Sequence, residues 1–189
     1  MIPDKIIAAS GNEGKIREIK EILKNTEIIP MKEAGFDEDI EETGSSFREN
    51  ALIKARAVSE KTGLAVLADD SGLCVDFLGG APGIYSARFS GEGVKANRAL
   101  LLKRMQGATD RKAYFECAIC LYYPDGRYVF GIGKTYGKIL EKETGEGGFG
   151  YDPLFFSDDL NKSFAEAAPE EKNAVSHRAR AIRDLLTKI

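Results

Sequence analysis

Two short segments combine residue types that could bind and hydrolyse a phosphorylated ligand. The first, Ser10-Gly-Asn-Glu-Gly-Lys15, lies where an apolar run ends and a helical pattern begins. The N-terminus of a helix offers unpaired N–H groups and partial positive charge, and Lys15 adds a full charge. A Walker A loop leaves a longer gap between its two glycines, so this is not a P-loop. The segment predicts a phosphate site of another kind, with an ordinary capped turn as the alternative.

The second segment is the acidic pair Asp69-Asp70, which directly follows the apolar run Leu64–Ala68. Neighbouring side chains of a strand point to opposite faces, so we expect only one of the pair to face a ligand. Carboxylates suit Mg²⁺, which prefers oxygen ligands and often bridges protein and phosphate. The acidic stretch Asp37–Glu42 could supply a further metal ligand, or be a solvated loop.

Two further segments could hold a base. Gly147-Gly-Phe-Gly-Tyr-Asp152 places two aromatic rings among glycines, which predicts a stacking platform unless both rings fold into the core. The single histidine, His177, precedes Arg178, and Lys172 lies shortly before them. Such side chains can donate hydrogen bonds to purine carbonyls, although a lone histidine often has a structural role.

Composition excludes several classes of protein. The chain has 189 residues, with 27 Lys and Arg against 30 Asp and Glu, so no overall positive field exists to hold nucleic acid. No apolar run approaches the roughly 18 residues that span a bilayer, and the apolar start is too short for a signal peptide. We therefore expect a cytoplasmic protein with neither nucleic-acid nor membrane partners. The three cysteines predict no disulfide framework, and Cys117 and Cys120 should point to opposite faces of a strand.

Periodicity predicts the elements that position these segments. One helical stripe follows the first apolar strand, a second helix begins after Ser46, and Pro124-Asp-Gly126 divides a long hairpin. Asp69–Gly72 is predicted to separate two strands, and a last helix runs from Val175 to Ile189. The predicted fold is α/β: a long mixed β-sheet flanked by helices, forming one compact domain over residues 1–189.

The motifs taken together resemble the inosine triphosphate pyrophosphatase family, which hydrolyses non-standard purine nucleoside triphosphates to the monophosphate and pyrophosphate. The resemblance covers nearly the whole chain, and the order of the motifs is more specific than any one of them. The matching segments are Ser10–Lys15, Glu41–Gly44, Phe47–Ala51, Lys54–Arg56, Ala68–Gly72, Gly79–Arg88, Gly148–Asp152 and Glu171–Arg178. The family often has Thr where this chain has Ser10, which keeps the hydroxyl.

The resemblance implies a cleft between two lobes, a homodimer, and an activity that removes ITP, dITP and XTP from the nucleotide pool. It implies that Asp70 is the proton acceptor and a Mg²⁺ ligand, and that Glu41 is a second metal ligand, with Glu42 beside it as the alternative. The residues implied to contact the phosphates or the nucleotide are Ser10, Gly11, Asn12, Glu13, Gly14, Lys15, Lys54 and Ser71. Those implied to form the base and sugar site are Phe149, Gly150, Tyr151, Asp152, Lys172, His177 and Arg178.

Two competing interpretations remain. One is a pyrophosphatase of modified pyrimidine triphosphates, as in the Maf-like proteins, against which the His177-Arg178 pair and the Gly148–Asp152 loop argue. The other is a non-catalytic nucleotide-binding or RNA-binding module. The acidic balance and the Asp69-Asp70 pair argue against RNA, because carboxylates repel phosphates unless a metal intervenes.

Overall fold

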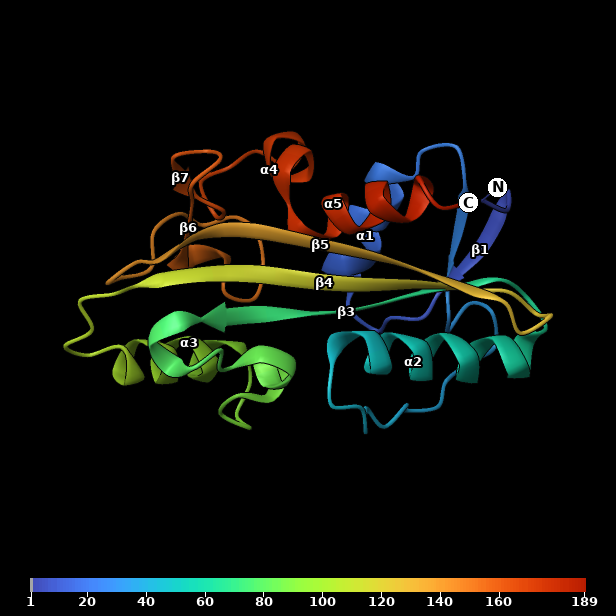
Figure 1. Cartoon of the computed structure of the whole chain (residues 1–189), viewed down its shortest axis with the longest axis horizontal. Helices are drawn as coiled ribbons and strands as arrows, with labels where there is room; N and C mark the ends of the chain where they lie inside the picture. Colours follow the sequence, from blue (N-terminus) through green and yellow to red (C-terminus); the bar gives the residue numbers. More distant parts are fainter. Residues whose placement is uncertain (1) are drawn as a thin grey trace. The chain divides into compact units, whose positions relative to one another are not determined.

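A computed structural model of the chain describes residues 2–189 and contains a seven-stranded mixed sheet with helices packed on it (Figure 1). The strand order is β2-β1-β3-β4-β5-β6-β7. Strand β1 runs parallel to β2 and β3, whereas β6 is antiparallel to β5 and β7. The bounds are β1 Lys5–Ala8, β2 Glu27–Pro30, β3 Val66–Val75, β4 Lys112–Tyr122, β5 Tyr128–Ile139, β6 Phe155–Ser157 and β7 Lys162–Ser163. The predicted α/β class with a mixed sheet is confirmed.

The helices begin where the capping residues place them. The side chain of Asn12 accepts a hydrogen bond from the Lys15 N–H at the start of α1, and Ser46 does the same for Glu49 at the start of α2. The α-helices are α1 Glu13–Ile22, α2 Phe47–Thr62, α3 Val94–Arg104, α4 Pro169–Val175 and α5 His177–Leu186. The 3₁₀ turns are η1 Asp76–Leu78, η2 Gly83–Arg88 and η3 Asp152–Leu154. Within residues 2–189, no helix is both long and apolar enough to cross a membrane.

The described chain divides into two compact units. Unit 1 contains the described residues up to Asp70, Cys117–Gly133 and Arg178–Ile189, and unit 2 contains Ser71–Glu116 and Lys134–His177. Strands β3, β4 and β5 each contribute residues to both units. The single domain over residues 1–189 and the cleft between lobes stay predictions.

Unit 1 has a helical layer on each face of its part of the sheet, with α1 and α5 on one face and α2 on the other (Figure 1). The alternation of strand side chains explains both layers. Leu67 packs in the cluster with α1 and α5, whereas Val66 and Ala68 pack in the cluster with α2. Cys117 and Cys120 fall in different clusters, so the prediction that they point to opposite faces is confirmed.

Unit 2 has its own core, in which aromatic rings pack among aliphatic side chains. Phe115 on β4 packs against Phe155 on β6, with ring centroids 4.7 Å apart, and against Phe164. Leu101 and Met105 belong to the same cluster and come from α3 and its C-terminal end. This core encloses the segment that follows the glycine-rich loop.

The structure corrects two predicted boundaries. Strand β3 runs without a break through Asp69–Gly72, which were expected to form a turn. Gly72 lets the strand pass close to η2, because a Cβ there would lie 2.2 Å from the Gly83 carbonyl oxygen. The last helix was predicted from Val175, but α4 and α5 are separate helices with Ser176 between them.

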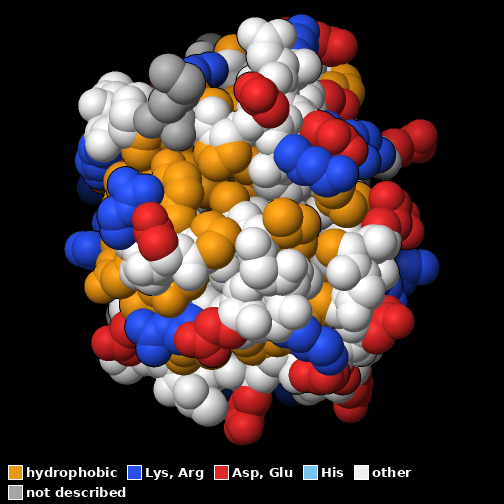
Figure 2. All heavy atoms as spheres, turned by 90° about the vertical axis from the view of Figure 1, so that its right-hand side faces the viewer, with side chains coloured by type: hydrophobic (Ala, Val, Ile, Leu, Met, Phe, Trp, Pro, Cys, Tyr) orange, Lys and Arg blue, Asp and Glu red, His pale blue; other side chains and the backbone are white. Residues whose placement is uncertain are grey.

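Figure 2 shows charged side chains of both signs around a patch of hydrophobic side chains. This distribution agrees with the near balance of acidic and basic residues in the sequence.

Candidate active site

The segment Ser10–Lys15 forms the turn between β1 and the start of α1, as its sequence predicts. Asn12 caps the helix, and its own N–H donates to the Ser10 hydroxyl oxygen at 3.1 Å. Ser10, Gly11, Asn12, Glu13 and Gly14 are exposed or half-buried. The loop therefore leaves the N-terminal end of α1 open to an anion.

Asp69 and Asp70 point to opposite faces of β3, as expected for neighbours in a strand. Asp69 lies on the side of α1, where Lys15 Nζ is 3.1 Å from Asp69 Oδ2. Asp70 lies on the side of α2, where Asn50 Nδ2 donates to Asp70 Oδ2 at 3.0 Å. Each carboxylate therefore has its own set of partners in unit 1.

Asp70 and Lys54 form the centre of the α2 side. Lys54 Nζ lies 3.7 Å from Asp70 Oδ1 and 2.7 Å from Glu42 Oε1. Burial is the main cause that raises the pKa of Asp70, and the Glu42 charge adds to it, against the opposing charge of Lys54. Burial alone would lower the pKa of Lys54, but the charges of Asp69, Asp70 and Glu42 outweigh it and raise that pKa. An ammonium held between carboxylates stays charged and available to neutralise phosphate.

Glu42, and not Glu41, is the carboxylate that joins this cluster. Glu41 is exposed, whereas Glu42 is half-buried and pairs with Lys54. The structure thus brings Glu42 to Lys54 and leaves Glu41 exposed, and which of the two binds a metal stays a prediction. Sequence spacing cannot separate two adjacent acidic residues in a segment without regular structure.

Asp69 belongs to a buried charge cluster on the α1 side. Arg178 Nη2 donates to Asp69 Oδ2 at 2.9 Å and Nε at 3.2 Å, and Nη1 pairs with Glu18. Burial would raise the pKa of Asp69, but the charges of Lys15, Arg178 and Lys54 outweigh it and hold that pKa well below its ordinary value. Asp69 is therefore an anion at neutral pH.

This arrangement gives Arg178 partners within the protein, and its contact with a base stays a prediction. The residue was expected to donate to a purine carbonyl, but it is only 1% exposed and its guanidinium engages two carboxylates of unit 1. Turning it toward a ligand would leave Asp69 and Glu18 without that partner in a buried place, which is costly.

The glycine-rich loop of unit 2 is held by Asp152. Its Oδ2 accepts hydrogen bonds from the Phe149 N–H at 2.8 Å and from Lys172 Nζ at 2.6 Å. Lys172 Nζ also lies 4.4 Å from the centroid of the Phe149 ring. Phe149 and Gly150 are half-buried, whereas Asp152 and Lys172 are buried. The loop thus presents one ring beside a fixed cation.

Two other residues predicted for the base site belong to the core of unit 2 instead. The Tyr151 ring packs in the core, its hydroxyl donates to the Ser86 carbonyl oxygen at 2.8 Å, and burial raises its pKa. His177 stacks on Phe115 with centroids 4.8 Å apart and is 5% exposed. Both side chains therefore pack within the protein, and their contact with a ligand stays a prediction. Ser71 is half-buried on β3, directly after Asp70.

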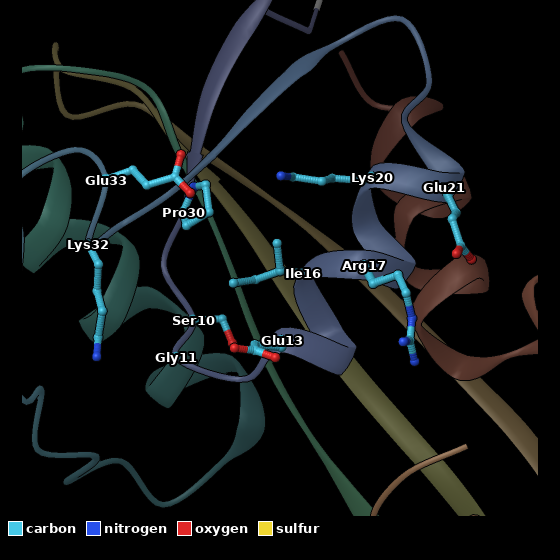
Figure 3. A pocket seen from close by; sticks show the side chains of 10 residues that line it. All are labelled: Ser10, Gly11, Glu13, Ile16, Arg17, Lys20, Glu21, Pro30, Lys32 and Glu33. Carbon is cyan, nitrogen blue, oxygen red and sulfur yellow. The ribbon is translucent and has the colours of Figure 1, made fainter. Parts of the chain in front are cut away.

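A hollow of about 590 Å³ lies beside the Ser10–Lys15 segment in unit 1 (Figure 3). Ser10 and Gly11 line it together with Ile16 and Pro30. Its charged lining is balanced between three basic and three acidic residues: Arg17, Lys20, Lys32, Glu13, Glu21 and Glu33. This hollow gives the outer side of the loop contact with solvent.

Sequence reasoning missed two residues of unit 1. Asn50 was named only within a motif, although its side chain binds both Asp70 and the Gly44 N–H. Glu18 was not singled out at all. Its position one helical turn beyond Lys15, among apolar residues of α1, was the available signal.

Comparisons with known sequences show the family to which the chain is similar. The sequence model described as the Ham1 family matches residues 6–188. A dITP/XTP pyrophosphatase of Clostridium perfringens is 47% identical over 193 residues, covering 96% of this chain and 95% of that protein. One of Treponema denticola is 47% identical over 183 residues, covering 94% of each chain.

Solved structures show the same fold. The Staphylococcus aureus Ham1 protein has a TM-score of 0.86 at 41% identity, with 97% of each chain covered. A HAM1 protein from Coxiella burnetii has a TM-score of 0.87 at 40% identity, covering 98% of this chain and 99% of that one. The family resemblance inferred from the motifs is confirmed.

Proposed function

The chain belongs to the Ham1 family, and from this premise we propose that it hydrolyses non-standard purine nucleoside triphosphates to the monophosphate and pyrophosphate. The proposed substrates are ITP, dITP and XTP. The observation that carries the proposal is the placement of Lys15 and Lys54 beside the adjacent carboxylates Asp69 and Asp70. The printed names of the relatives support the choice of substrate.

The triphosphate is proposed to bind to unit 1. The open end of α1 attracts the phosphate oxygens, and Lys15 and Lys54 neutralise the charge that develops on them during reaction. Electrostatic stabilisation of this kind needs donors that are already in position. The ion pairs of Lys15 with Asp69 and of Lys54 with Glu42 hold both ammonium groups in position.

In the proposed reaction, water attacks the α-phosphorus while the bond from that phosphorus to the bridging oxygen breaks. Asp70 orients this water and accepts its proton, and pyrophosphate leaves with the electron pair of the broken bond. Asn50 fixes the Asp70 carboxylate by donating to Oδ2 at 3.0 Å. No covalent intermediate with the protein is needed.

A divalent cation, with Mg²⁺ as the proposed ion, fits the donor set of unit 1. Asp70 and Glu42 would hold the ion, because burial and then the Glu42 charge raise the pKa of Asp70, and a cation would offset that charge. The described residues contain no group of three His, Cys, Asp or Glu side chains that could hold a metal. A site of two carboxylates suits Mg²⁺, which commonly takes its remaining ligands from substrate phosphates and water. When bound, the ion would supply charge neutralisation at the phosphates and raise the acidity of the water.

The base is proposed to bind to the loop of unit 2. Phe149 offers a face for stacking, and Lys172 offers ammonium donors beside that face. A 6-carbonyl, as in hypoxanthine and xanthine, accepts from such a donor, whereas the 6-amino group of adenine cannot. Lys172, His177, Arg178 and the backbone N–H groups of the loop are the proposed selective donors.

Two further proposals rest on the family resemblance: a homodimer and a cytoplasmic location. Three large side chains of unit 2 are exposed and are candidate dimer contacts, namely Phe77, Tyr85 and Tyr136, at 50%, 57% and 56% exposure. Light scattering of the purified chain would distinguish monomer from dimer.

Pyrophosphate release from ITP, XTP, ATP, GTP and UTP, with Mg²⁺ or with EDTA, tests the function. We expect kcat/KM for ITP and XTP to exceed that for ATP and GTP by about a hundredfold, because a donor site rejects a misplaced amino group strongly. Preference for pyrimidine nucleotides would favour the Maf-like alternative. Binding of nucleotides without release would favour the non-catalytic module.

A further inference from the structure

Four charged side chains of unit 1 form one connected chain of ion pairs. Glu18 pairs with Arg178, Arg178 pairs with Asp69, and Asp69 pairs with Lys15. The side chains of Glu18, Arg178 and Asp69 are 6%, 1% and 0% exposed, whereas that of Lys15 is 17% exposed. These ion pairs therefore reach solvent, and any ligand, chiefly through Lys15.

The ion pairs join three elements through a single carboxylate oxygen. Oδ2 of Asp69, on β3, accepts from two nitrogens of Arg178, on α5, and lies 3.1 Å from Lys15 Nζ, on α1. Glu18 takes the third nitrogen, Nη1, of the same guanidinium. Lys15 and Glu18 are three residues apart on α1 and so lie on neighbouring positions of one helix face.

We propose that Glu18 and Arg178 are positioning residues for phosphate binding that act through Asp69 on Lys15. This inference rests on the proposed function in taking the ligand of Lys15 to be a triphosphate. Glu18 holds the guanidinium on one side, so that Asp69 Oδ2 remains shared between Arg178 and the ammonium. Without that restraint, the guanidinium competes with Lys15 for Asp69, and its uncompensated positive charge repels the ammonium.

The charges of the cluster favour this role over a purely structural one. Two cations and two anions sum to zero, so the cluster is balanced before a ligand binds. The side chain of Lys15 is 17% exposed, so its ammonium can donate to a phosphate oxygen while Asp69 Oδ2 holds it in place.

A double-mutant cycle tests the proposal. The variants are Glu18→Gln, Lys15→Ala and their combination, with Glu27→Gln as a control because Glu27 forms an exposed ion pair of unit 1. Calorimetry measures binding of inorganic tripolyphosphate to each folded variant, and pyrophosphate release from ITP is measured alongside. Glu18→Asp, which keeps the charge, tests rescue, and circular dichroism verifies folding.

We expect Glu18→Gln to weaken tripolyphosphate binding about tenfold when Lys15 is present and less than about twofold in the Lys15→Ala background. Glu18→Asp should recover part of the affinity, and Glu27→Gln should bind like the unmodified chain. Equal losses in both backgrounds, or no loss in either, would overturn the proposal, as would an unfolded Glu18→Gln accompanied by a folded Glu18→Asp of full affinity. If the unmodified chain releases no pyrophosphate yet shows this coupling, the proposed function fails and the positioning role stands.

Discussion

The two residues of the acidic pair, Asp69 and Asp70, have different partners because they point to opposite faces of β3. Asp70, bound by Asn50 and near Lys54, is the proposed proton acceptor, whereas Asp69 is enclosed by Lys15 and Arg178. The same side-chain chemistry therefore serves a reaction at one position and the placement of a cation at the next.

Asp70→Asn keeps the shape of the side chain and removes its charge. We expect kcat with ITP at saturating Mg²⁺ to fall about a hundredfold or more, with an unchanged circular dichroism spectrum, as for loss of a general base. Asp76→Asn, at an exposed position just beyond β3, is the matched control. Retention of most of kcat by Asp70→Asn would show that another group orients the water.

Glu42→Gln and Glu41→Gln compare two adjacent acidic residues that sequence spacing cannot separate. Lys54 contacts both Glu42 and Asp70, so Glu42 lies close to the proposed Mg²⁺ ligand Asp70. Glu42→Gln should raise the Mg²⁺ concentration for half-maximal activity about tenfold, which is at the lower end of the effect expected for loss of a charged contact. Glu41→Gln should change that concentration by less than about twofold. The reverse order in a Mg²⁺ titration would restore the original choice of Glu41.

At the scale of elements, apolar runs and periodicity predicted β1, the start of β3, the β4–β5 hairpin and the loop that precedes α1. Lys15 and the Asp69-Asp70 pair could be predicted as candidates from the pattern because each follows an apolar strand, whereas the roles of Lys54 and of Asp70 in particular are implied only by the family resemblance. The Arg178–Glu18 pair could not be predicted, since it joins residues 160 positions apart. Likewise, strand β7 has only two residues and no period to detect.

Strand β5 and helix α5 approach each other closely at Gly131. A Cβ at this position would lie 2.0 Å from the Ala181 carbonyl oxygen and 2.7 Å from the Leu185 nitrogen. We expect Gly131→Ala to lower the free energy of unfolding by about 1–3 kcal/mol, as overpacked sites do, measured by urea denaturation. Gly11→Ala, where a Cβ meets nothing within 4 Å, should cost less. Equal costs would mean that β5 and α5 can separate freely.

Strand β4 hides both cysteines of the C-x-x-C pair. Burial raises the pKa of Cys117 and that of Cys120 to about 12. Because the thiolate is the reactive form, about one part in 10⁴ of each thiol is ionised at pH 8, and neither should react rapidly with a disulfide reagent in the native protein. Unfolding in guanidinium should expose all three thiols at once, and fast labelling of native Cys117 or Cys120 would contradict this burial.

For the whole molecule, the sharing of β3, β4 and β5 between the units predicts cooperative unfolding. The chain contains no tryptophan, so Phe130→Trp reports on unit 1 and Phe156→Trp on unit 2 without background. We expect both variants to give coincident fluorescence midpoints in urea, as two-state domains do. Midpoints separated by more than about 0.5 M would mean that the units unfold independently, against a single domain over residues 1–189.

The way the backbone passes between the two units also limits how the protein can be divided. It crosses from one unit to the other after Asp70, Glu116, Gly133 and His177. One proteolytic cut therefore releases neither unit intact, and no uninterrupted gene fragment encodes either. Neither unit can be removed by a single truncation, because each is built from separate stretches of the chain. The residues of unit 1 and those of unit 2 must therefore be inherited together.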